Sequence, residues 1–220
     1  MITAKLTKRP VLKAVVTKPY QGKGYAEGYA DGKQDGKDEA EAEILWTNYG
    51  IMYKKHYIIS AEGVDGIRNN AYQNANKMET LEVPNIRSIW SAFSNVFQNC
   101  TALKSVKLPK ILRIGANYFI GCTALEEVVL GCEEYPMEYI SSNVFNGCSA
   151  LVRFRYIGTI SASLSFANSP LLDDESIQGI VDALAEVATA QTLTLHNTVG
   201  NKLTDAQKAT ITAKKWTLVY

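Results

Sequence analysis

The chain has 220 residues, of which 46% are hydrophobic and 20% are charged, and its formal net charge is +1. This length is enough for one large domain or two small ones with a substantial core. The near-neutral charge gives no electrostatic argument for nucleic acid or an anionic membrane as a partner, and we expect neither.

The N-terminal residues do not have the pattern of a secretory signal. Lys5, Lys8 and Arg9 are basic, but no long apolar run follows them. No apolar stretch approaches the roughly 20 residues that span a bilayer. We therefore expect synthesis in the cytoplasm without a signal peptide. Residues 2–17 alternate apolar and polar positions in two runs broken by Pro10, which predicts a short strand segment within residues 1–20.

A glycine-rich segment follows at residues 21–48. Its glycines recur every four residues, so in a helix they would form one ridge that another backbone could approach closely. Each glycine also costs a helix roughly 1 kcal/mol relative to alanine, so a flexible linker is the other interpretation. If the segment is a helix, the residues that would support homo-oligomer assembly are Gly24, Gly28, Gly32, Gly36, Tyr25 and Tyr29.

Aromatic residues gather just after this segment. We expect them to cap the first coil of the fold described below, and the alternative is an exposed aromatic patch that binds carbohydrate or protein. His56 lies beside two lysines with no carboxylate or serine partner in the sequence, and we interpret it as a surface residue. The aromatic group comprises Trp46, Tyr49, Tyr53 and Tyr57, together with Met52.

The rest of the chain is organised around a repeated stretch, FQNCTALKSVKL, which begins at Phe97. It returns at Phe119 as FIGCTALEEVVL and at Phe145 as FNGCSALVRFRY, with looser copies from Tyr72 and Phe166. The shared frame is an aromatic residue, a cysteine or small residue three positions later, an aliphatic residue at six, and apolar residues at nine and eleven. Repeats of 20–30 residues, each too small to bury its own apolar face, predict a stacked solenoid.

Each unit should carry two strand-like edges. Apolar residues six, nine and eleven positions after the aromatic predict one short strand, and an isoleucine five positions before it predicts a second edge. Asn99, Gly121 and Gly147 are expected in turns that need a left-handed backbone. The residues that we expect to hold the repeat together are Phe97, Cys100, Leu103, Phe119, Cys122, Leu125, Phe145, Cys148 and Leu151.

The four cysteines fit a buried role better than a chemical one. Cys100, Cys122 and Cys148 occupy the same place in successive units, which predicts a column of free thiols in the core. Cys132 lies outside the repeated frame, so we expect it to be less constrained. A metal site would need a C-x-x-C pair or a nearby histidine, and the sequence has neither. We expect no metal and no cofactor.

These units resemble the BspA-like leucine-rich repeat family, whose pattern reads roughly I-G-x-x-A-F-x-x-C-x-x-L-x-x-V-x-L-P. Residues 114–130 follow it well, and the resemblance covers about Ile67 to Leu172. It implies a curved solenoid and a role in binding rather than catalysis. The glycine-rich segment and the C-terminal region more weakly resemble tail-associated proteins of bacterial prophages. The resemblance thus implies a part of a phage particle or a bacterial surface.

The pattern changes after Leu172. Asp173 or Asp174 can cap a helix whose apolar residues run from Ile177 to Ala188 at helical spacing. A strand is expected at 192–195, a second helix begins with a capping box of Thr204 and Gln207 and continues to about Lys214, and a last strand covers 216–219. His196, after the first of these strands, is expected on the surface. We expect residues 173–220 to cap the open end of the solenoid.

The predicted fold is therefore an α/β repeat solenoid. Leucine-rich-repeat-like coils of short parallel strands occupy residues 49–172, between an N-terminal glycine-rich helical or linker segment and a C-terminal helix and strand cap. The favoured function is a non-enzymatic module that binds protein or glycan. The alternative is an enzyme whose carboxylates converge across coils, for which the sequence supplies no recognisable motif, or a domain of no assignable function.

Overall fold

The computed structural model describes residues 56–58, 67, 69–84, 94–137 and 139–220. The predicted strand segment at 1–20 and the glycine-rich segment at 21–48 lie outside these residues, as does most of the aromatic group before the repeats. Among the described residues, no helix is long and apolar enough to cross a membrane.

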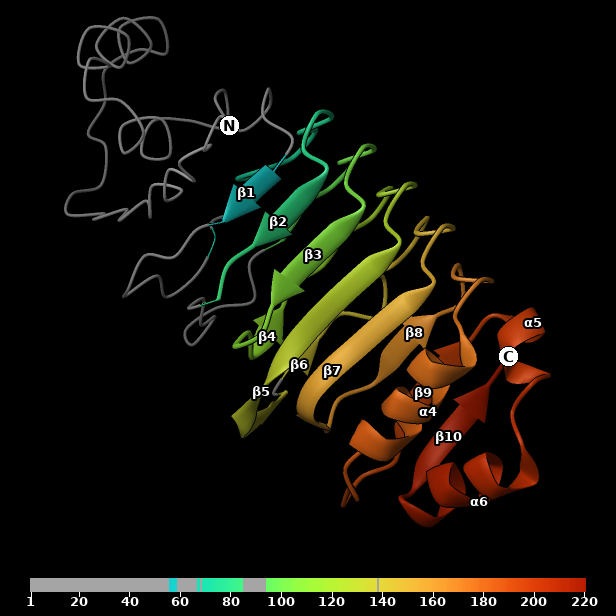
Figure 1. Cartoon of the computed structure of the whole chain (residues 1–220). Coiled ribbons are helices and arrows are strands. Elements are labelled where there is room, and N and C mark those ends of the chain that lie inside the picture. The colour runs from blue at the N-terminus through green and yellow to red at the C-terminus, as the bar shows by residue number, and fades with distance from the viewer. Residues whose placement is uncertain (1–55, 59–66, 68, 85–93, 138) are drawn as a thin grey trace, which may run out of the picture.

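Successive repeats pair in parallel to form the main sheet (Figure 1). The core-facing residues Leu81, Val106, Val128 and Phe154 stand opposite one another on four neighbouring strands. The copies that begin at Tyr72, Phe97, Phe119 and Phe145 therefore each contribute one strand at the same register, as the repeat predicts. In spatial order the strands are β1 (His56–Ile58), β2 (Thr80–Glu82), β3 (Ser105–Leu108), β5 (Glu127–Met137) and β7 (Arg153–Ile160).

A second edge of the coils carries smaller parallel sheets. Ile114 and Ile140, the isoleucines five residues before an aromatic, pair in a two-stranded sheet as expected. Further along, a three-stranded parallel sheet has the order β10-β9-β8. These strands are β4 (Arg113–Ile114), β6 (Tyr139–Ile140), β8 (Leu164–Phe166), β9 (Gln191–Leu195) and β10 (Trp216–Val219).

The core between the sheets contains a continuous column of aromatic rings. Consecutive rings are stacked at centroid distances of 5.3, 5.4, 5.8 and 5.1 Å, with interplanar angles of 13° or less. Because each ring packs on the ring of the next copy, a coil buries its apolar face only against its neighbours. The column consists of Tyr72, Phe97, Phe119, Phe145 and Phe166.

The three repeated cysteines lie in the core as free thiols. Cys122 donates its S–H to the carbonyl oxygen of Phe97 at 3.0 Å, and Cys148 donates to that of Phe119 at 3.2 Å. The bond spans one coil boundary in each case, so the thiol is a small hydrophobic group that also satisfies a carbonyl. In the last copy Ser169 is buried at the cysteine position.

The turns use left-handed backbone where the sequence predicts it. Asn99 has a φ of 59°, Gly121 of 74° and Gly147 of 78°. A methyl group on Gly147 would meet the backbone of Gly121 at 3.3 Å, so the turns also stack closely. This position of the repeat is therefore occupied by asparagine or glycine, because both tolerate the left-handed conformation.

A ladder of asparagine amides runs beside these turns. The amide N–H of Asn143 donates to the side-chain oxygen of Asn117. In the same way, the amide N–H of Asn117 donates to the side-chain oxygen of Asn95 at 2.9 Å, and that of Asn95 donates to Asn70 at 3.0 Å. The ladder therefore links four consecutive coils through side chains of one kind.

The C-terminal unit continues the stack with helices. Helix α4 (Asp174–Ala183) connects β8 to β9, while α5 (Asn197–Gly200) and α6 (Asp205–Ala213) connect β9 to β10. Parallel neighbours joined through helices are two βαβ connections. The capping box of Thr204 and Gln207 is present, as predicted.

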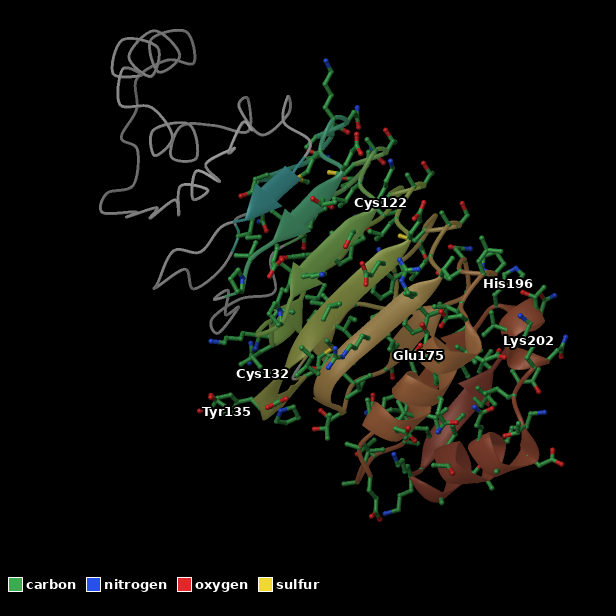
Figure 2. All side chains as sticks on the ribbon, in the orientation of Figure 1. Cys122, Cys132, Tyr135, Glu175, His196 and Lys202 are labelled. Atoms are coloured by element: carbon green, nitrogen blue, oxygen red, sulfur yellow. The ribbon has the colours of Figure 1, made fainter. Side chains whose placement is uncertain are left out.

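Two sequence expectations need correction, and a third remains a prediction. Helix α4 ends at Ala183, because Leu184 pairs with Ile160 in a β-bridge and Ala188 is exposed. Strands β5 and β7, with 11 and 8 residues, are longer than the short strands that the sequence predicts. Cys132 lies outside the repeated frame and is buried as well, because β5 continues past Leu130. It is 4% exposed while the other three cysteines are fully buried, so its weaker constraint remains a prediction. Figure 2 shows it at the opposite end of the sheet from Cys122.

Candidate binding face

The main sheet turns one face to the core and the other outward. On β3, Val106 and Leu108 are buried while Ser105 and Lys107 are not, and the same alternation continues on β5 and β7. Since side chains alternate across a strand, the parallel register gathers the outward residues into rows. One row contains Ser105, Glu127 and Arg153, and the next contains Lys107, Val129 and Arg155.

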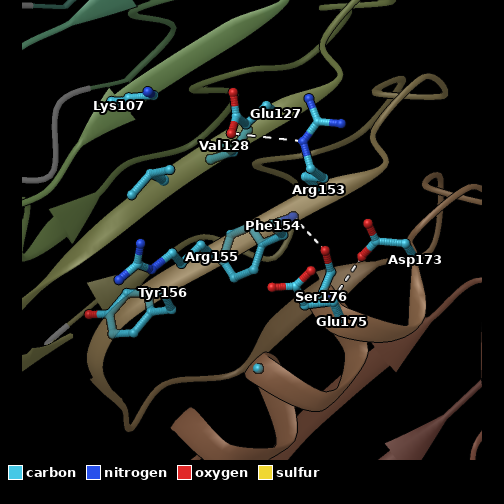
Figure 3. Close-up of a pocket in the computed structure, with 12 residues that line it drawn as sticks. Lys107, Glu127, Val128, Arg153, Phe154, Arg155, Tyr156, Asp173, Glu175 and Ser176 are labelled. Atoms are coloured by element: carbon cyan, nitrogen blue, oxygen red, sulfur yellow. Dashed lines mark hydrogen bonds and ion pairs between the residues drawn. The ribbon is translucent and has the colours of Figure 1, made fainter.

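A groove of about 510 Å³ lies where this face meets α4 (Figure 3). Both rows contribute to its lining, and the first two turns of α4 form its other side. Its volume lies in the range of roughly 300–1,000 Å³ that is typical of ligand pockets. The polar and small residues that line it are Lys107, Glu127, Arg153, Arg155, Asp173, Glu175, Ser176 and Gly179.

The position of α4 follows from the repeat itself. The backbone N–H of Lys104, Glu126 and Val152 each donates to the preceding copy, and Asp173 continues the series by donating to Val152 at 3.0 Å. At this point the next strand would begin, but the side chain of Asp173 accepts from the N–H of Ser176 at 2.8 Å and caps a helix instead.

Ser176 then fixes the helix against the edge of β7. Its hydroxyl accepts from the N–H of Phe154 at 2.9 Å and donates to the carbonyl of Val152 at 3.2 Å. A serine side chain thus replaces a strand partner at the edge, and the groove wall is tied to the sheet by hydrogen bonds. Figure 3 shows the contacts of Ser176 with Phe154 and Asp173 beside the outward side chains of Arg153 and Arg155.

Two carboxylates of the groove are already engaged. Glu127 accepts from the hydroxyl of Ser105 at 3.1 Å, and one of its oxygens lies 3.8 Å from Nε of Arg153. Asp173 caps α4. Lys107 and Arg155 are exposed and form no ion pair within 4 Å with any residue in the described part of the chain. The second row therefore holds two available cations on either side of Val129.

Among its described lining residues, the groove contains no pair of a nucleophile and a base. Ser176 is committed to two backbone groups, and no histidine lines the groove. Within the described residues, no group of three His, Cys, Asp or Glu side chains could hold a metal ion. Of the three carboxylates in the groove, Glu127 bridges strands, Asp173 caps a helix, and Glu175 is exposed.

The two histidines occupy different settings. His56 belongs to β1, and its side chain is outside the described residues. His196 precedes α5, where its Nδ1 accepts from the N–H of Thr198 at 3.2 Å. It therefore caps a short helix, a structural role that its surface interpretation did not include.

The repeat residues named from the sequence all lie in the core, and the face consists of residues that the sequence argument did not select. Lys107, Arg153 and Arg155 occupy the variable positions between the repeated apolar ones. The sequence could have identified these residues, because alternation within a strand predicts that they point outward and the constant spacing of the repeats predicts that they form rows. The groove itself could not be predicted in this way, because one side of it forms only where α4 packs against β7.

Comparison with known proteins extends the repeat in both directions. A family model described as BspA type leucine rich repeat region matches residues 53–180 in six copies, more than half of the chain. The match begins upstream of Ile67 and includes β1, a copy that the five-unit pattern missed. No curated protein and no solved structure matches the chain.

Proposed function

The chain belongs to the BspA-type leucine-rich repeat family, whose repeats form protein-binding or structural modules, and we propose that it binds a partner protein through the outer face of its main sheet. The proposal takes the chain to be non-enzymatic, with the groove beside α4 as the centre of the contact. The face supplies polar, charged and apolar side chains in regular rows, which is the composition of a recognition surface.

The observation that carries this proposal is the pair of outward rows on β3, β5 and β7, together with the groove that they share with α4. The aromatic column, the thiol bonds and the asparagine ladder lie behind or beside this face and join consecutive coils. A face supported in this way is ordered before binding, so a partner does not have to supply the free energy of ordering it.

The proposed context is a phage particle or a bacterial surface, with several copies held together through the glycine-rich segment. This part rests on the sequence of residues 24–36 and on the prophage resemblance. Several modules on one stalk would gain avidity from weak individual contacts. Light scattering on the full chain and on a chain starting at Glu39 tests it, because a full-length monomer at micromolar concentration would remove the reason for the glycine ridge.

The binding face can be tested without a known partner. A library of random displayed peptides is selected on the immobilised full chain, and the selected peptides are measured against two matched variants. Val129→Gln changes the centre of the face, while Val219→Gln changes a valine that is 46% exposed on β10. We expect Val129→Gln to weaken the selected peptides about tenfold and Val219→Gln to leave them unchanged.

Two results would contradict the proposal. Selected peptides that ignore Val129→Gln would place the binding surface elsewhere on the molecule. Glycans that bind an array of the same chain, with no peptide selected, would replace the protein partner by the glycan partner that the sequence left open.

A further inference from the structure

Resting on the proposed function, we infer that the groove between β7 and α4 takes an extended acidic segment of the partner, with a carboxylate held between Lys107 and Arg155. The inference has three supports: the charges that remain available in the groove, the spacing of the two cations, and a glycine in α4.

The first support is the difference between formal and available charge. Three basic and three acidic side chains line the groove, so their formal charges cancel. Glu127 is joined to Ser105 and Arg153, and Asp173 is joined to the start of α4. Among the acids only the exposed Glu175 remains, against Lys107 and Arg155. The groove therefore has more unsatisfied cationic than anionic hydrogen-bonding capacity, which favours an anionic ligand.

The second support is where the two cations stand. Lys107, Val129 and Arg155 are register partners on three neighbouring strands. Adjacent strands are about 4.8 Å apart, so the two cationic residues begin about 10 Å apart with a valine between them. Both side chains are long enough to reach an anion above Val129. Arginine can bind a carboxylate with two parallel hydrogen bonds, and lysine adds a point charge.

Glu82 does not remove this preference. It stands opposite Lys107 on β2, at the far side of the row from Arg155, and no ion pair within 4 Å joins it to Lys107 in the described structure. Of the two, Arg155 is nearer to α4, because it stands on β7, the strand against which α4 packs, while Val129 separates it from Lys107. It should therefore contribute more to binding than Lys107.

The third support is Gly179, which lies inside α4 and lines the groove. A Cβ added there would meet no atom within 4 Å. Alanine would thus fit without a clash and would favour the helix, so packing gives no reason for the glycine. A bare backbone at this position does have an effect in the groove, because it leaves room for another chain to lie close to α4.

An extended peptide suits this shape better than a compact ligand. The groove follows the outer face of β7 and is bounded by a helix that runs beside that strand. A peptide in this position presents alternate side chains to the groove, one toward Val129 and the cations and the next toward solvent. Acidic residues at alternate positions would meet the cationic row.

The probe is a fluorescein-labelled octapeptide of alternating Glu and Thr, and its control has Gln in place of every Glu. Binding to the full chain is followed by fluorescence anisotropy. We expect the Glu peptide to bind at least about tenfold more tightly than the Gln peptide, and its affinity to fall as salt is added. Arg155→Gln should weaken the Glu peptide about tenfold, and Lys107→Gln should weaken it less.

Lys202→Gln is the matched control, because Lys202 is an exposed lysine in the C-terminal unit, far from the groove in Figure 2. It should leave binding unchanged. Gly179→Ala separates binding from stability: we expect Tm to rise by about 2–4 °C while the peptide binds more weakly. Gly179→Gln, with a longer side chain that also favours a helix, should weaken the peptide further.

Equal affinity for the Glu and Gln peptides would overturn the inference, as would Glu-peptide binding that is unaffected by Arg155→Gln. An eight-nucleotide oligothymidylate that binds as tightly as the Glu peptide would also overturn it, because the groove would then attract any anion. The proposed function fails separately, when peptides selected from the random library do not depend on Val129. Library peptides that depend on Val129 but show no excess of acidic residues leave the proposed function standing and remove only this inference.

Discussion

The repeats and the C-terminal unit extend the same stack in two different ways. In the repeats, the copies that begin at Tyr72, Phe97, Phe119 and Phe145 each add a strand to the main sheet and a ring to the aromatic column. In the C-terminal unit, α4 takes the place of the next strand, while β8, β9 and β10 continue on the other edge. The core thus continues across the boundary, and the main sheet stops there.

The difference shows where a growing sheet can be ended. The backbone hydrogen bonds between successive copies continue as far as Asp173, which donates to Val152. Leu172, the aliphatic residue before it, is buried like its equivalents in the other copies. Only the strand itself is replaced, with Ser176 bonding the edge of β7 in its place. An edge covered by a helix cannot pair with another chain, so the C-terminal unit protects the stack from sheet-to-sheet association.

Removing the C-terminal unit should have the largest effect. Deleting residues 173–220 exposes the edge of β7 together with buried side chains such as Phe166 and Leu164. We expect the truncated chain to aggregate and to lose its cooperative thermal transition, measured by light scattering and circular dichroism. A truncated chain that stays soluble and melts in one sharp step would show that the repeats end themselves.

Breaking the aromatic column should come next. Phe119 is fully buried between the rings of Phe97 and Phe145, so Phe119→Ala should destabilise the protein by about 3–5 kcal/mol. The control is Tyr139→Ala, which removes an aromatic ring that is 46% exposed on β6 and should cost less than about 1 kcal/mol. Urea denaturation measures both, and similar losses would mean that the column is not what joins the coils.

Alkaline pH should weaken the repeats through their buried acids. Burial raises the pKa of Cys148 from its ordinary 9.0 to about 12 and that of Tyr72 from 10.0 to about 12. The folded protein keeps both protons until the pH approaches 12, whereas the unfolded chain loses the Cys148 proton near pH 9 and the Tyr72 proton near pH 10. Stability is therefore fully present below about pH 9 and falls as pH rises toward 12, by up to about 1.4 kcal/mol per pH unit for each group.

The Tyr72→Phe variant tests the assignment, because it keeps the ring that stacks on Phe97 and removes one titrating group. Its thermal midpoint should fall less steeply between pH 9 and 12 than that of the unchanged chain. An unchanged slope would assign the alkaline loss to other residues.

The smallest expected effect separates two cysteines. A serine at position 122 can still donate to the carbonyl of Phe97, as the thiol does. Cys132 is buried, and no hydrogen bond of its thiol joins it to another described residue, so Cys132→Ser would bury an unpaired hydroxyl at a cost of about 1–3 kcal/mol. We therefore expect Cys132→Ser to lose more stability in thermal melts. This reverses the order predicted from the repeat frame, and a larger loss in Cys122→Ser would restore that order.

Much of the repeat could be predicted from the sequence because its rule is local. An aromatic residue, a cysteine and three apolar positions recur at fixed spacing, and each of these features packs only on its equivalent in the next copy. The same locality explains the left-handed turns at Asn99 and Gly121. The copy at β1 was missed because it lacks both the small residue or cysteine and the aliphatic residue of the other copies: Ile51 and Lys54 stand at the equivalents of Cys100 and Leu103.

The proposed binding face was harder to predict, because its residues do not belong to the repeated pattern. Its residues, such as Lys107 and Arg155, are the positions that the repeat leaves free, so no pattern selects them. The predicted end of α4 was wrong because Leu184 and Val187 continue the helical spacing of apolar residues. In the structure, Leu184 instead forms a β-bridge with Ile160. The spacing of apolar residues predicts which residues are buried, but it does not show whether they belong to a helix or to a chain that leaves the helix and returns to the core.

The asparagine ladder gives the stack a polarity. Asn95, Asn117 and Asn143 each donate toward the preceding coil, so these three amide dipoles point the same way along the axis. The acceptor end is closed at Asn143, whose side-chain oxygen accepts from the hydroxyl of Ser141. The opposite end, at Asn70, presents an N–H that a further coil could use only if it offered an oxygen. Like the start of a helix, the N-terminal end of this row of amides therefore carries a partial positive charge that would favour an acceptor or an anion there.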